Sequence, residues 1–578
     1  MFPASQGGTA VLQLAKAAAA GSRPLQQLCL VRLTSTSGPA QRASQAGVCP
    51  MANHGLADEG VVGPSACPAG ATAASSSSQS PSTSSASAGA KALSTALPYA
   101  EVPGPKGLPM LGSLLDYTKL GAYSLDKMHE AIVDRFKTYG PIYRENIAGA
   151  EAVHILDPKD VADLFRNEGR NPRRITLEPM AYYRKIRKKN AGLANLQGEQ
   201  WRKWRSALQH FLLKPESVAH WIPSMEGCAN DFVKLMESRR DRSGEIADFH
   251  GQVHKWSLES SFAIVLGKRI GCLDTGSKTN AEASKLIASS IGFFKGLCNL
   301  TFGFPLYKYG IQTKTWHEFA EAQDIFHNLS MKYVKQCIEE HRRRDASGEA
   351  SERDEPDELN STVIDHLLRK ESLEFQDLCT LTTDLMLAAI DTMSNLMGYC
   401  LYCLAKNPEV QQRLHDEVQK ALPEGTPATA EALQNIPYLK AFVKETTRIF
   451  PPVDGTSRIS NHDITVRGYR IPANTLVRVH CLSGRMPQYF KEPNKFKPER
   501  WIRGHEEYEN IDPFLMLPFG KGSRMCLGRR LAEQDVYLLL ARIVQRFSVE
   551  WHHEDLDYIF RLSNVPSRPL SLTFRDRP

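Results

Sequence analysis

One cysteine near the C-terminus stands in a setting that could do chemistry. In the stretch PFGKGSRMCLGRRLAEQ, residues 518–534, Cys526 is surrounded by three glycines and has cations on both sides. The glycines let the backbone bend tightly and approach a flat ligand closely. Loop amides and the N-terminus of a following helix stabilise a thiolate, and Arg524 adds a cation for a ligand that carries carboxylates. The alternative is a glycine-rich turn with an incidental cysteine.

A second candidate for chemistry is an acid beside an alcohol. Asp391 and Thr392 end the stretch AAIDT, in the middle of a long apolar helical pattern. A polar pair in such a place costs stability unless it is satisfied, which favours a functional role. A hydroxyl next to a carboxyl group can pass protons in a site that excludes bulk water.

These residues need a large helical scaffold, and the sequence predicts one. The clearest helix, residues 375–405, would be roughly 45 Å long and would carry the acid–alcohol pair. Further helices are predicted at 409–421, at 439–449 and just past the cysteine, with short strands between 458 and 480. The fold class is therefore mainly α with a minor β part. Residues 101–578 contain no low-complexity break and no internal repeat, so we expect one domain.

The first hundred residues differ in composition from the rest. No acidic residue precedes Asp58, while Lys16 and three arginines punctuate an Ala-, Leu- and Ser-rich stretch, as in a mitochondrial transit peptide. We expect residues 1–57 to be such a transit segment, with a disordered cytosolic tail as the alternative. The composition of residues 58–100 predicts a disordered Ser/Ala-rich linker. No N-terminal run is long and apolar enough to span a bilayer.

Charge and cysteine usage set broad limits. The formal net charge of +7 permits an acidic partner or a membrane surface and requires neither, and nothing in the sequence indicates nucleic-acid binding. Twelve cysteines are scattered without a framework spacing, which favours a reducing compartment over a disulfide scaffold. Cys400 and Cys403 have redox-motif spacing, but their apolar helical surroundings predict packed core thiols.

The spacing around Cys526 is similar to a known signature. Phe519, Gly522, Arg524, Cys526 and Gly528 fit F-x-x-G-x-R-x-C-x-G, the heme-ligand motif of the cytochrome P450 family. Five fixed positions arise by chance on the order of once per million sites. The resemblance implies the cytochrome P450 fold, with heme b sandwiched between the long central helix and the C-terminal cysteine-loop helix. It also implies that the Cys526 thiolate is the ligand of the heme iron.

Other matches to the family imply further contacts with the heme. Trp201 and Arg205 in WRKWR stand one helical turn apart, so both could reach a heme propionate. Arg458 matches another propionate-binding arginine, and Arg524 would neutralise the same groups. The alternative for the first pair is a packed indole and a surface arginine, and Trp204 could replace Trp201 in part.

The same resemblance explains two more motifs. Glu445 and Arg448 in KETTR share a helix face, and with Arg500 in PERW they match a buried network that supports the heme loop, although an isolated Glu-x-x-Arg is usually a surface pair. Asp391 and Thr392 match the residues that manage protons during oxygen activation. The chain departs from the family at Ala389, where glycine is usual. A methyl group there would tighten the oxygen-binding groove, or the helix would tolerate it.

The resemblance extends to the mitochondrial branch of the family, whose members hydroxylate steroids, vitamin D and ecdysteroids. In that branch a small acidic [2Fe–2S] ferredoxin, reduced by an NADPH-dependent reductase, docks on the proximal face. The candidate docking residues are Lys440, Lys444, Arg529 and Arg530, with an ordinary solvated basic face as the alternative. The dipeptides Cys49-Pro50 and Cys67-Pro68 resemble regulatory heme motifs, but two residues are expected by chance.

The expected substrate is a lipophile that enters from a membrane. Residues 291–310 are aromatic and apolar and match the access region, which dips into the bilayer in this branch, with a core loop as the alternative. The basic run at residues 184–189 would help on anionic lipid or form a solvated loop. Leu385, Val453 and Val565 are pocket-lining candidates by family position. Together these features predict peripheral attachment to the matrix side of the mitochondrial inner membrane.

The sequence therefore predicts a heme-thiolate monooxygenase that hydroxylates a steroid-like or xenobiotic lipophile with O2 and two electrons from ferredoxin. Two alternatives come from other classes. A heme-thiolate isomerase or dehydratase would need no external electrons, and such enzymes tend to lack the acid–alcohol pair. A non-catalytic heme sensor would only report a bound gas.

Overall fold

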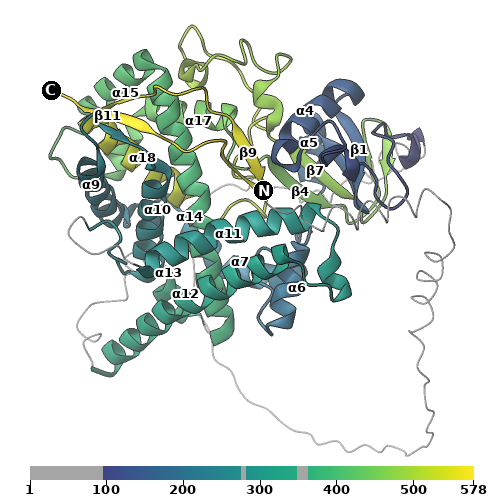
Figure 1. The fold of residues 1–578 in the computed structure, drawn as a ribbon, viewed down its shortest axis with the longest axis horizontal. Coiled ribbons are helices and arrows are strands. Elements are labelled where there is room, and N and C mark those ends of the chain that lie inside the picture. Colours follow the sequence, from purple (N-terminus) through teal and green to yellow (C-terminus); the bar gives the residue numbers. More distant parts are fainter. Residues whose placement is uncertain (1–94, 275–280, 348–361, 371) are drawn as a thin grey trace, which may run out of the picture. The chain divides into compact units, whose positions relative to one another are not determined.

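The computed structural model describes residues 95–274, 281–347, 362–370 and 372–578, and every element below lies in these ranges. The expected transit segment, most of the expected linker and the two Cys-Pro dipeptides lie outside the described residues. The described chain is mainly helical with short strands, which confirms the predicted fold class (Figure 1). Leu97 forms an isolated β-bridge with Tyr469, so chain contacts begin before the Pro-rich stretch at 103–109.

The helices differ greatly in length, and two exceed thirty residues. They are α4 (Met128–Tyr139), α5 (Pro158–Arg166), α6 (Glu178–Ile186), α7 (Gly198–Leu213), α8 (Pro215–Ala219), α9 (Ile222–Arg239), α10 (Phe249–Leu266), α11 (Ala281–Phe302), α12 (Lys314–Ser347), α13 (Val363–Leu368), α14 (Phe375–Lys406), α15 (Pro408–Ala421), α16 (Ala430–Gln434), α17 (Pro437–Ile449) and α18 (Arg529–Arg546).

The strands form small sheets. The largest has the order β1 (Ile142–Ile147), β2 (Ala150–Ile155), β7 (Leu476–His480) and β4 (Gly455–Ile459), and only β2 and β7 run parallel. A three-stranded sheet joins β3 (Glu245–Ile246), β11 (Leu572–Asp576) and β8 (Phe547–Glu550). Two hairpins pair β5 (Ile464–Val466) with β6 (Tyr469–Ile471), and β9 (Tyr558–Arg561) with β10 (Ser563–Pro566).

The predicted central helix is α14, and its bounds match the prediction within one residue. Glu374 and Asp377 form a reciprocal capping box that satisfies its first amides. Most of its residues are buried because α10, α12, α17 and α18 pack around it, and Figure 1 shows it running through the helical part. Pro408 opens α15 at the first helical position, as predicted. The Asn407 side chain caps the end of α14 instead, because its amide donates to the Cys403 carbonyl at 2.7 Å.

The cysteines of α14 behave as predicted. Cys400 and Cys403 are both buried and unoxidised within the main hydrophobic core. Burial raises the pKa of the Cys400 thiol to about 12, so it stays protonated at neutral pH. The CxxC spacing therefore marks core packing and not a redox motif.

The basic run 184–189 was predicted to contact anionic lipid or to form a solvated loop, and the second expectation is correct only in part. The run closes α6, and Arg184 turns inward, where it is buried and forms an ion pair with Asp384 on α14. Arg187 pairs with Asp324 of α12. These two guanidinium groups therefore tie α6 to the neighbouring helices, whereas Lys185 and Lys188 are exposed.

The apolar stretch 291–310 divides into two parts. Its first part continues α11 through Gly292 and Gly296 to Phe302, so the glycines do not break the helix, and side chains such as Phe293 are buried. The second part is a short loop with a 3-10 turn (Leu306–Tyr309), in which Phe304 and Tyr309 are exposed. No helix among the described residues is long and apolar enough to cross a membrane.

Candidate active site

The cysteine loop is a tight turn that ends at the start of α18. The Cys526 amide donates to the Phe519 carbonyl at 2.9 Å, and the Met525 amide donates to the Gly522 carbonyl at 3.1 Å. Gly522 has φ +72°, and a Cβ there would lie 2.1 Å from a carboxylate oxygen of Glu168, so only glycine fits. Gly528 is the N-cap residue of α18. The predicted loop and helix therefore place the cysteine just before a helix N-terminus.

The Cys526 side chain is accessible although its chain neighbours Arg524 and Leu527 are buried. Protein atoms nevertheless crowd the sulfur, and this burial raises the pKa of the thiol. The Gly528 amide and the charges of Arg205 and Arg174 act in the opposite direction and favour the thiolate. A metal ion bound to this accessible side chain would complete the stabilisation of the thiolate.

Arg524 is buried beside the loop. Its guanidinium donates to the carbonyls of Pro172 and Leu196 and to the side chain of Gln197, each at 2.9 Å. Its central carbon lies 3.9 Å from the centroid of the Trp201 ring on α7. Trp201 is therefore a stacking platform that fixes Arg524, which is an additional role for a residue predicted to reach a propionate directly.

Two more predicted arginines approach the same loop from α7 and β4. Arg205 donates to the Met525 carbonyl at 2.6 Å, which ties α7 to the residue before the cysteine. Arg458 donates to the Lys521 carbonyl at 2.9 Å and forms an ion pair with Glu168 at 2.5 Å. The structure therefore brings together all of the cofactor-binding side chains that the sequence singled out.

A fourth arginine, Arg174, belongs to the cluster and was missed by sequence reasoning. Burial first, and then the charges of Arg458 and Arg205, lower its pKa to about 10. Burial, and then the charges of Arg174, Arg458 and Arg205, lower the pKa of Arg524 to about 9. Its position in NPRRITLEPM carries no motif, so only the three-dimensional structure could reveal it.

The electrostatics of this cluster test whether a heme fits. Four guanidinium groups gather beside the cysteine loop, and Glu168 is the acid paired with one of them. Mutual repulsion and burial make this excess of positive charge costly unless an anion binds. A porphyrin with two carboxylates and an iron would supply the negative charges and the metal for the Cys526 sulfur. The residues present therefore fit heme b.

The middle of α14 presents an open stripe within a mostly buried helix. Leu385, Ala388, Ala389 and Thr392, spaced as one helix face, are exposed or half-buried, while the residues around them are buried. Thr392 Oγ1 donates back to the Ala388 carbonyl at 2.8 Å. The methyl group of Ala389, where the family usually has glycine, lies on this stripe.

Asp391 and Thr392 are neighbours in sequence but occupy different faces of α14. The Asp391 carboxylate is buried, and its Oδ2 accepts a hydrogen bond from Asn395 at 3.1 Å. Its Oδ1 lies 3.6 Å from Nε2 of His254 on α10. In this structure the acid and the alcohol therefore do not contact each other directly.

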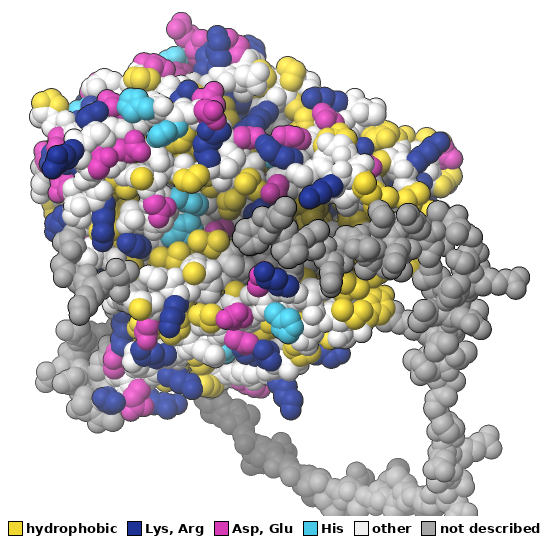
Figure 2. Space-filling view, viewed as in Figure 1, with side chains coloured by type: hydrophobic (Ala, Val, Ile, Leu, Met, Phe, Trp, Pro, Cys, Tyr) yellow, Lys and Arg dark blue, Asp and Glu magenta, His cyan; other side chains and the backbone are white. Residues whose placement is uncertain are grey.

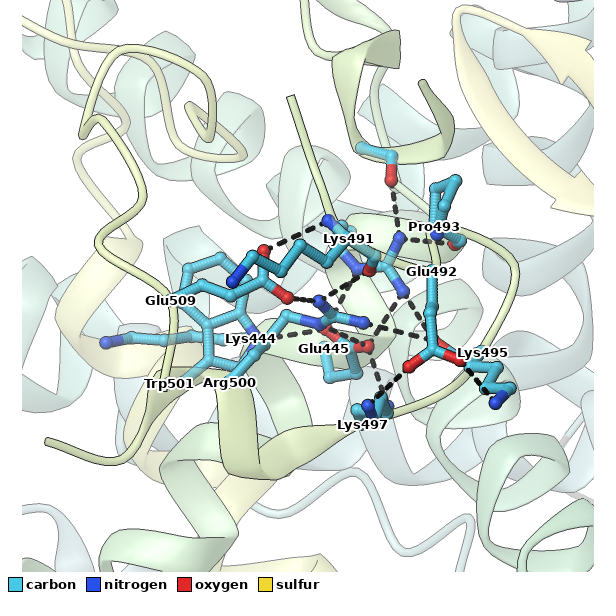
Figure 3. Close-up of polar contacts among 12 residues, drawn as sticks. Lys444, Glu445, Lys491, Glu492, Pro493, Lys495, Lys497, Arg500, Trp501 and Glu509 are labelled. Atoms are coloured by element: carbon cyan, nitrogen blue, oxygen red, sulfur yellow. Dashed lines mark hydrogen bonds and ion pairs between the residues drawn. The ribbon is translucent and has the colours of Figure 1, made fainter. Parts of the chain in front are cut away.

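The predicted Glu–Arg–Arg network is confirmed (Figure 3). Arg448 donates to both carboxylate oxygens of Glu445, at 2.9 and 2.7 Å, and Arg500 donates to one of them at 3.1 Å. The Trp501 indole and the Lys497 amide also donate to the Glu445 carboxylate. All three members of the charged triad are essentially inaccessible. The network fixes α17 against the segment that leads to the cysteine loop.

The candidate docking cations lie on α17 and α18. Arg529 and Arg530 approach the carboxylate of Glu533 at 3.0 and 3.7 Å, and Glu533 also acts on Lys440. Burial and the charge of Lys444 lower the pKa of Lys440. These interactions place Arg529, Arg530 and Lys440 near one carboxylate, and Lys444 near Lys440. Elsewhere on the surface, acidic and basic side chains are interspersed over the face shown in Figure 2.

The three pocket-lining candidates are half-buried. Leu385 lies on the open stripe of α14. Val565 follows Asn564, whose amide donates to the Pro452 carbonyl at 2.8 Å, so it stands near Val453. Apolar groups from α14, from the entrance to β4 and from β10 are therefore available to a lipophilic ligand.

Comparison with known proteins identifies the class to which this fold and site belong. The family model for Cytochrome P450 matches residues 102–574, nearly the whole of the described chain. The chain belongs to the cytochrome P450 family and is a monooxygenase, an oxidoreductase that, like the family, binds heme b through an axial cysteine thiolate.

Individual relatives are similar over most of their length. The chain is 35% identical to Cytochrome P450 10 of Lymnaea stagnalis over 83% of this chain and 86% of the relative. It is 33% identical to the mitochondrial 1,25-dihydroxyvitamin D(3) 24-hydroxylase of Rattus norvegicus, over 82% and 89% of the two chains. It is also 33% identical to the mitochondrial 25-hydroxyvitamin D-1 alpha hydroxylase of Homo sapiens, over 83% and 93%. These relatives are consistent with the mitochondrial branch of the family.

Proposed function

We propose that the protein hydroxylates a lipophilic small molecule in mitochondria, with Cys526 as the axial heme ligand and a [2Fe–2S] ferredoxin as the electron donor. The observation that carries the proposal is the accessible Cys526 sulfur beside a cluster of buried guanidinium groups. A thiolate and an excess of positive charge together suit an iron porphyrin that bears two carboxylates. Few other ligands need both.

In this proposal the arginines bind and orient the heme carboxylates. Arg205 and Arg458 hold the loop through backbone carbonyls and keep donor capacity for an anion. Arg524 is fixed by Trp201, and Arg174 completes the positive charge. When bound, the heme supplies oxygen activation, and thiolate ligation favours cleavage of the O–O bond.

Thr392 is the residue of this chain placed to handle protons at the open stripe. Its hydroxyl is half-buried and holds its hydrogen on the Ala388 carbonyl, so it can rotate to donate elsewhere. Ala388 and Ala389 flank it with methyl groups that offer no competing hydrogen bond. Asp391, held behind the helix, is the acid that would restore protons to Thr392.

We propose a sterol- or steroid-like substrate, with a xenobiotic lipophile as the alternative. The groups available to it, Leu385, Val453 and Val565, are apolar and offer no charge. Two relatives at 33% identity carry vitamin D hydroxylase names, which supports the sterol class. The remaining sequence differences leave room for a different member of that class.

The proposed electron donor docks on the basic residues around Glu533. Lys440 and Lys444 on α17 and Arg529 and Arg530 on α18 lie on elements that flank the cysteine loop. A small acidic ferredoxin would be steered there by complementary charge. An NADPH-dependent reductase would reduce that ferredoxin.

The proposed location is the matrix side of the mitochondrial inner membrane, with peripheral attachment. Two relatives at 33% identity are named mitochondrial, which supports the compartment. Phe304, Tyr309 and Ile311 are exposed in one loop, which supports shallow insertion of this loop into a bilayer. Residues 1–57 would direct import.

Reconstitution tests the proposal and separates it from its competitors. Purified protein, mitochondrial ferredoxin, its reductase and NADPH are combined with sterols, ecdysteroids or lipophilic toxins. Substrate-dependent NADPH consumption with a product one oxygen atom heavier is expected. A rearranged product without NADPH consumption would identify an isomerase, and a protein that binds gases without turnover would be a sensor.

A further inference from the structure

Asp391 has an unusual partner on the neighbouring helix. Its side chain is 3% exposed, and its Oδ1 lies 3.6 Å from Nε2 of His254, which is 2% exposed on α10. Its other oxygen, Oδ2, accepts from Asn395 at 3.1 Å. The acid of the acid–alcohol pair is therefore held against a buried imidazole and not against Thr392.

The hydrogen bonds of His254 determine its tautomer. Nδ1 lies 2.8 Å from the His250 carbonyl, which can only accept, so Nδ1 carries a hydrogen. Nε2 is buried and has no hydrogen-bond partner among the described residues. In a neutral ring Nε2 is then an acceptor that faces Oδ1 of Asp391. Two acceptors at this distance repel each other, and one proton between them converts the repulsion into attraction.

The neighbouring side chains hold His254 and Asp391 in place, but none of them is a source of the proton between the two. The Asn395 amide donates to Asp391 and to Ser563 of β10, and its oxygen accepts from His250 at 2.9 Å. Burial lowers the pKa of His250 to about 3, and burial raises the pKa of Tyr399 on α14 well above its usual range. These two titratable groups are therefore neutral near pH 7, and Ser563 does not titrate.

We propose that His254 and Asp391 share one proton, and that His254 is a positioning residue that keeps Asp391 supplied with protons. The inference rests on the proposed function, because hydroxylation by O2 with two electrons also consumes two protons and releases one water. In each delivery the O–H bond at Asp391 breaks as its proton leaves toward Thr392. A proton from bulk water then restores the pair.

Hydrogen exchange at the imidazole C2 position tests the shared proton without turnover. It is followed by mass spectrometry on the full-length holoprotein as a function of pH, which gives a midpoint for each histidine. The pH midpoint of His254 should fall by about one unit or more in Asp391→Asn, because the partner that retains the proton is lost. The exposed His552 serves as the internal control and should not move. An unchanged His254 midpoint overturns the proposal.

Turnover of His254→Gln tests the supply of protons. Glutamine retains a donor toward Asp391 but carries no mobile proton, so product formed per NADPH should fall about 10-fold or more, most strongly above neutral pH. His366→Gln, which replaces a buried histidine on α13, should stay within about twofold of wild type, as expected for a change outside the site. His254→Asn serves as the second variant if His254→Gln loses heme.

The two experiments separate every outcome. If the His254 midpoint shifts in Asp391→Asn but product formed per NADPH is unchanged in both His254 variants, His254 does not keep Asp391 supplied with protons, and that part of the proposal is overturned. Failure of the proposed function would appear differently, as a wild-type protein without thiolate-ligated heme, and the exchange experiment would still decide whether the proton is shared.

Discussion

The guanidinium of Arg524 stacks on the indole of Trp201, with 3.9 Å between its central carbon and the ring centroid. This contact links the cysteine loop to α7 and orients three hydrogen bonds from Arg524. A planar cation with fixed donors is needed here, because an ammonium group could neither stack in the same way nor make the same bonds.

Arg524→Lys should therefore weaken heme binding. Loss of charge-assisted bonds of about 2 kcal/mol corresponds to about 30-fold faster heme loss. Transfer of heme to an apoglobin acceptor measures the rate. Arg503→Lys, at an exposed position, is the control. Equal rates of heme loss in both variants would show that Arg524 does not hold the cofactor.

Glu445→Gln should cost about 3–5 kcal/mol of folding free energy, because it leaves Arg448 and Arg500 buried without their shared carboxylate. Most of the variant should be insoluble or free of heme, as measured by soluble yield and heme content. Glu492→Gln changes an exposed acid paired with Lys495 and should behave like wild type. A Glu445→Gln protein that melts with the wild type would contradict a scaffolding role.

Stability should fall in mild acid because of a buried histidine pair. His154 on β2 and His480 on β7 share a hydrogen bond of 2.9 Å, and burial lowers the pKa of both well below the usual value. In the unfolded chain these imidazoles bind protons below about pH 6.5, whereas in the folded protein they remain neutral. The free energy of unfolding is therefore highest above that pH, and below it falls by up to about 1.4 kcal/mol per pH unit for each histidine.

His480→Gln should remove one of these contributions and flatten the dependence of unfolding free energy on pH between 5 and 7. The glutamine amide can still form a hydrogen bond with His154. The variant is therefore compared with wild type by the slope of unfolding free energy against pH and not by the absolute free energy. His552→Gln, at an exposed position, should leave the slope unchanged. Identical slopes in wild type and His480→Gln would refute the assignment.

Glu533→Gln should strengthen ferredoxin binding. The Glu533 carboxylate partly neutralises Arg529 and Arg530, so its removal should lower the KM for ferredoxin about two- to fivefold at low ionic strength. The gain should disappear at high salt, where exposed charges are screened. Glu554→Gln, at a remote exposed acid, should have no effect. A Glu533→Gln protein with a higher KM would indicate that ferredoxin docks elsewhere.

The sequence predicted what local patterns encode. Helical periodicity and the Pro408 start signal defined α14, and the spaced glycines around Cys526 identified the loop. Glu445 and Arg500 could be paired because each belongs to a recognisable motif. Each motif is set by residues close together in the chain, although Glu445 and Arg500 themselves are far apart in sequence.

Features created by tertiary contact were not predictable in the same way. Arg174 joins the arginine cluster from a loop without a motif. Arg184 points inward because it forms an ion pair with Asp384 on α14. His254 meets Asp391 only because α10 packs against α14. No periodicity marks a single polar residue whose partner lies more than a hundred residues away.

The spectrum of the reduced protein with carbon monoxide tests the central claim most directly. Thiolate ligation by Cys526 predicts a band at about 450 nm in the wild type, and its loss in Cys526→His even where heme is retained. Cys481→Ser, which alters a buried thiol elsewhere, should keep the band. Absence of the band in the wild type, or its persistence in Cys526→His, would contradict the account.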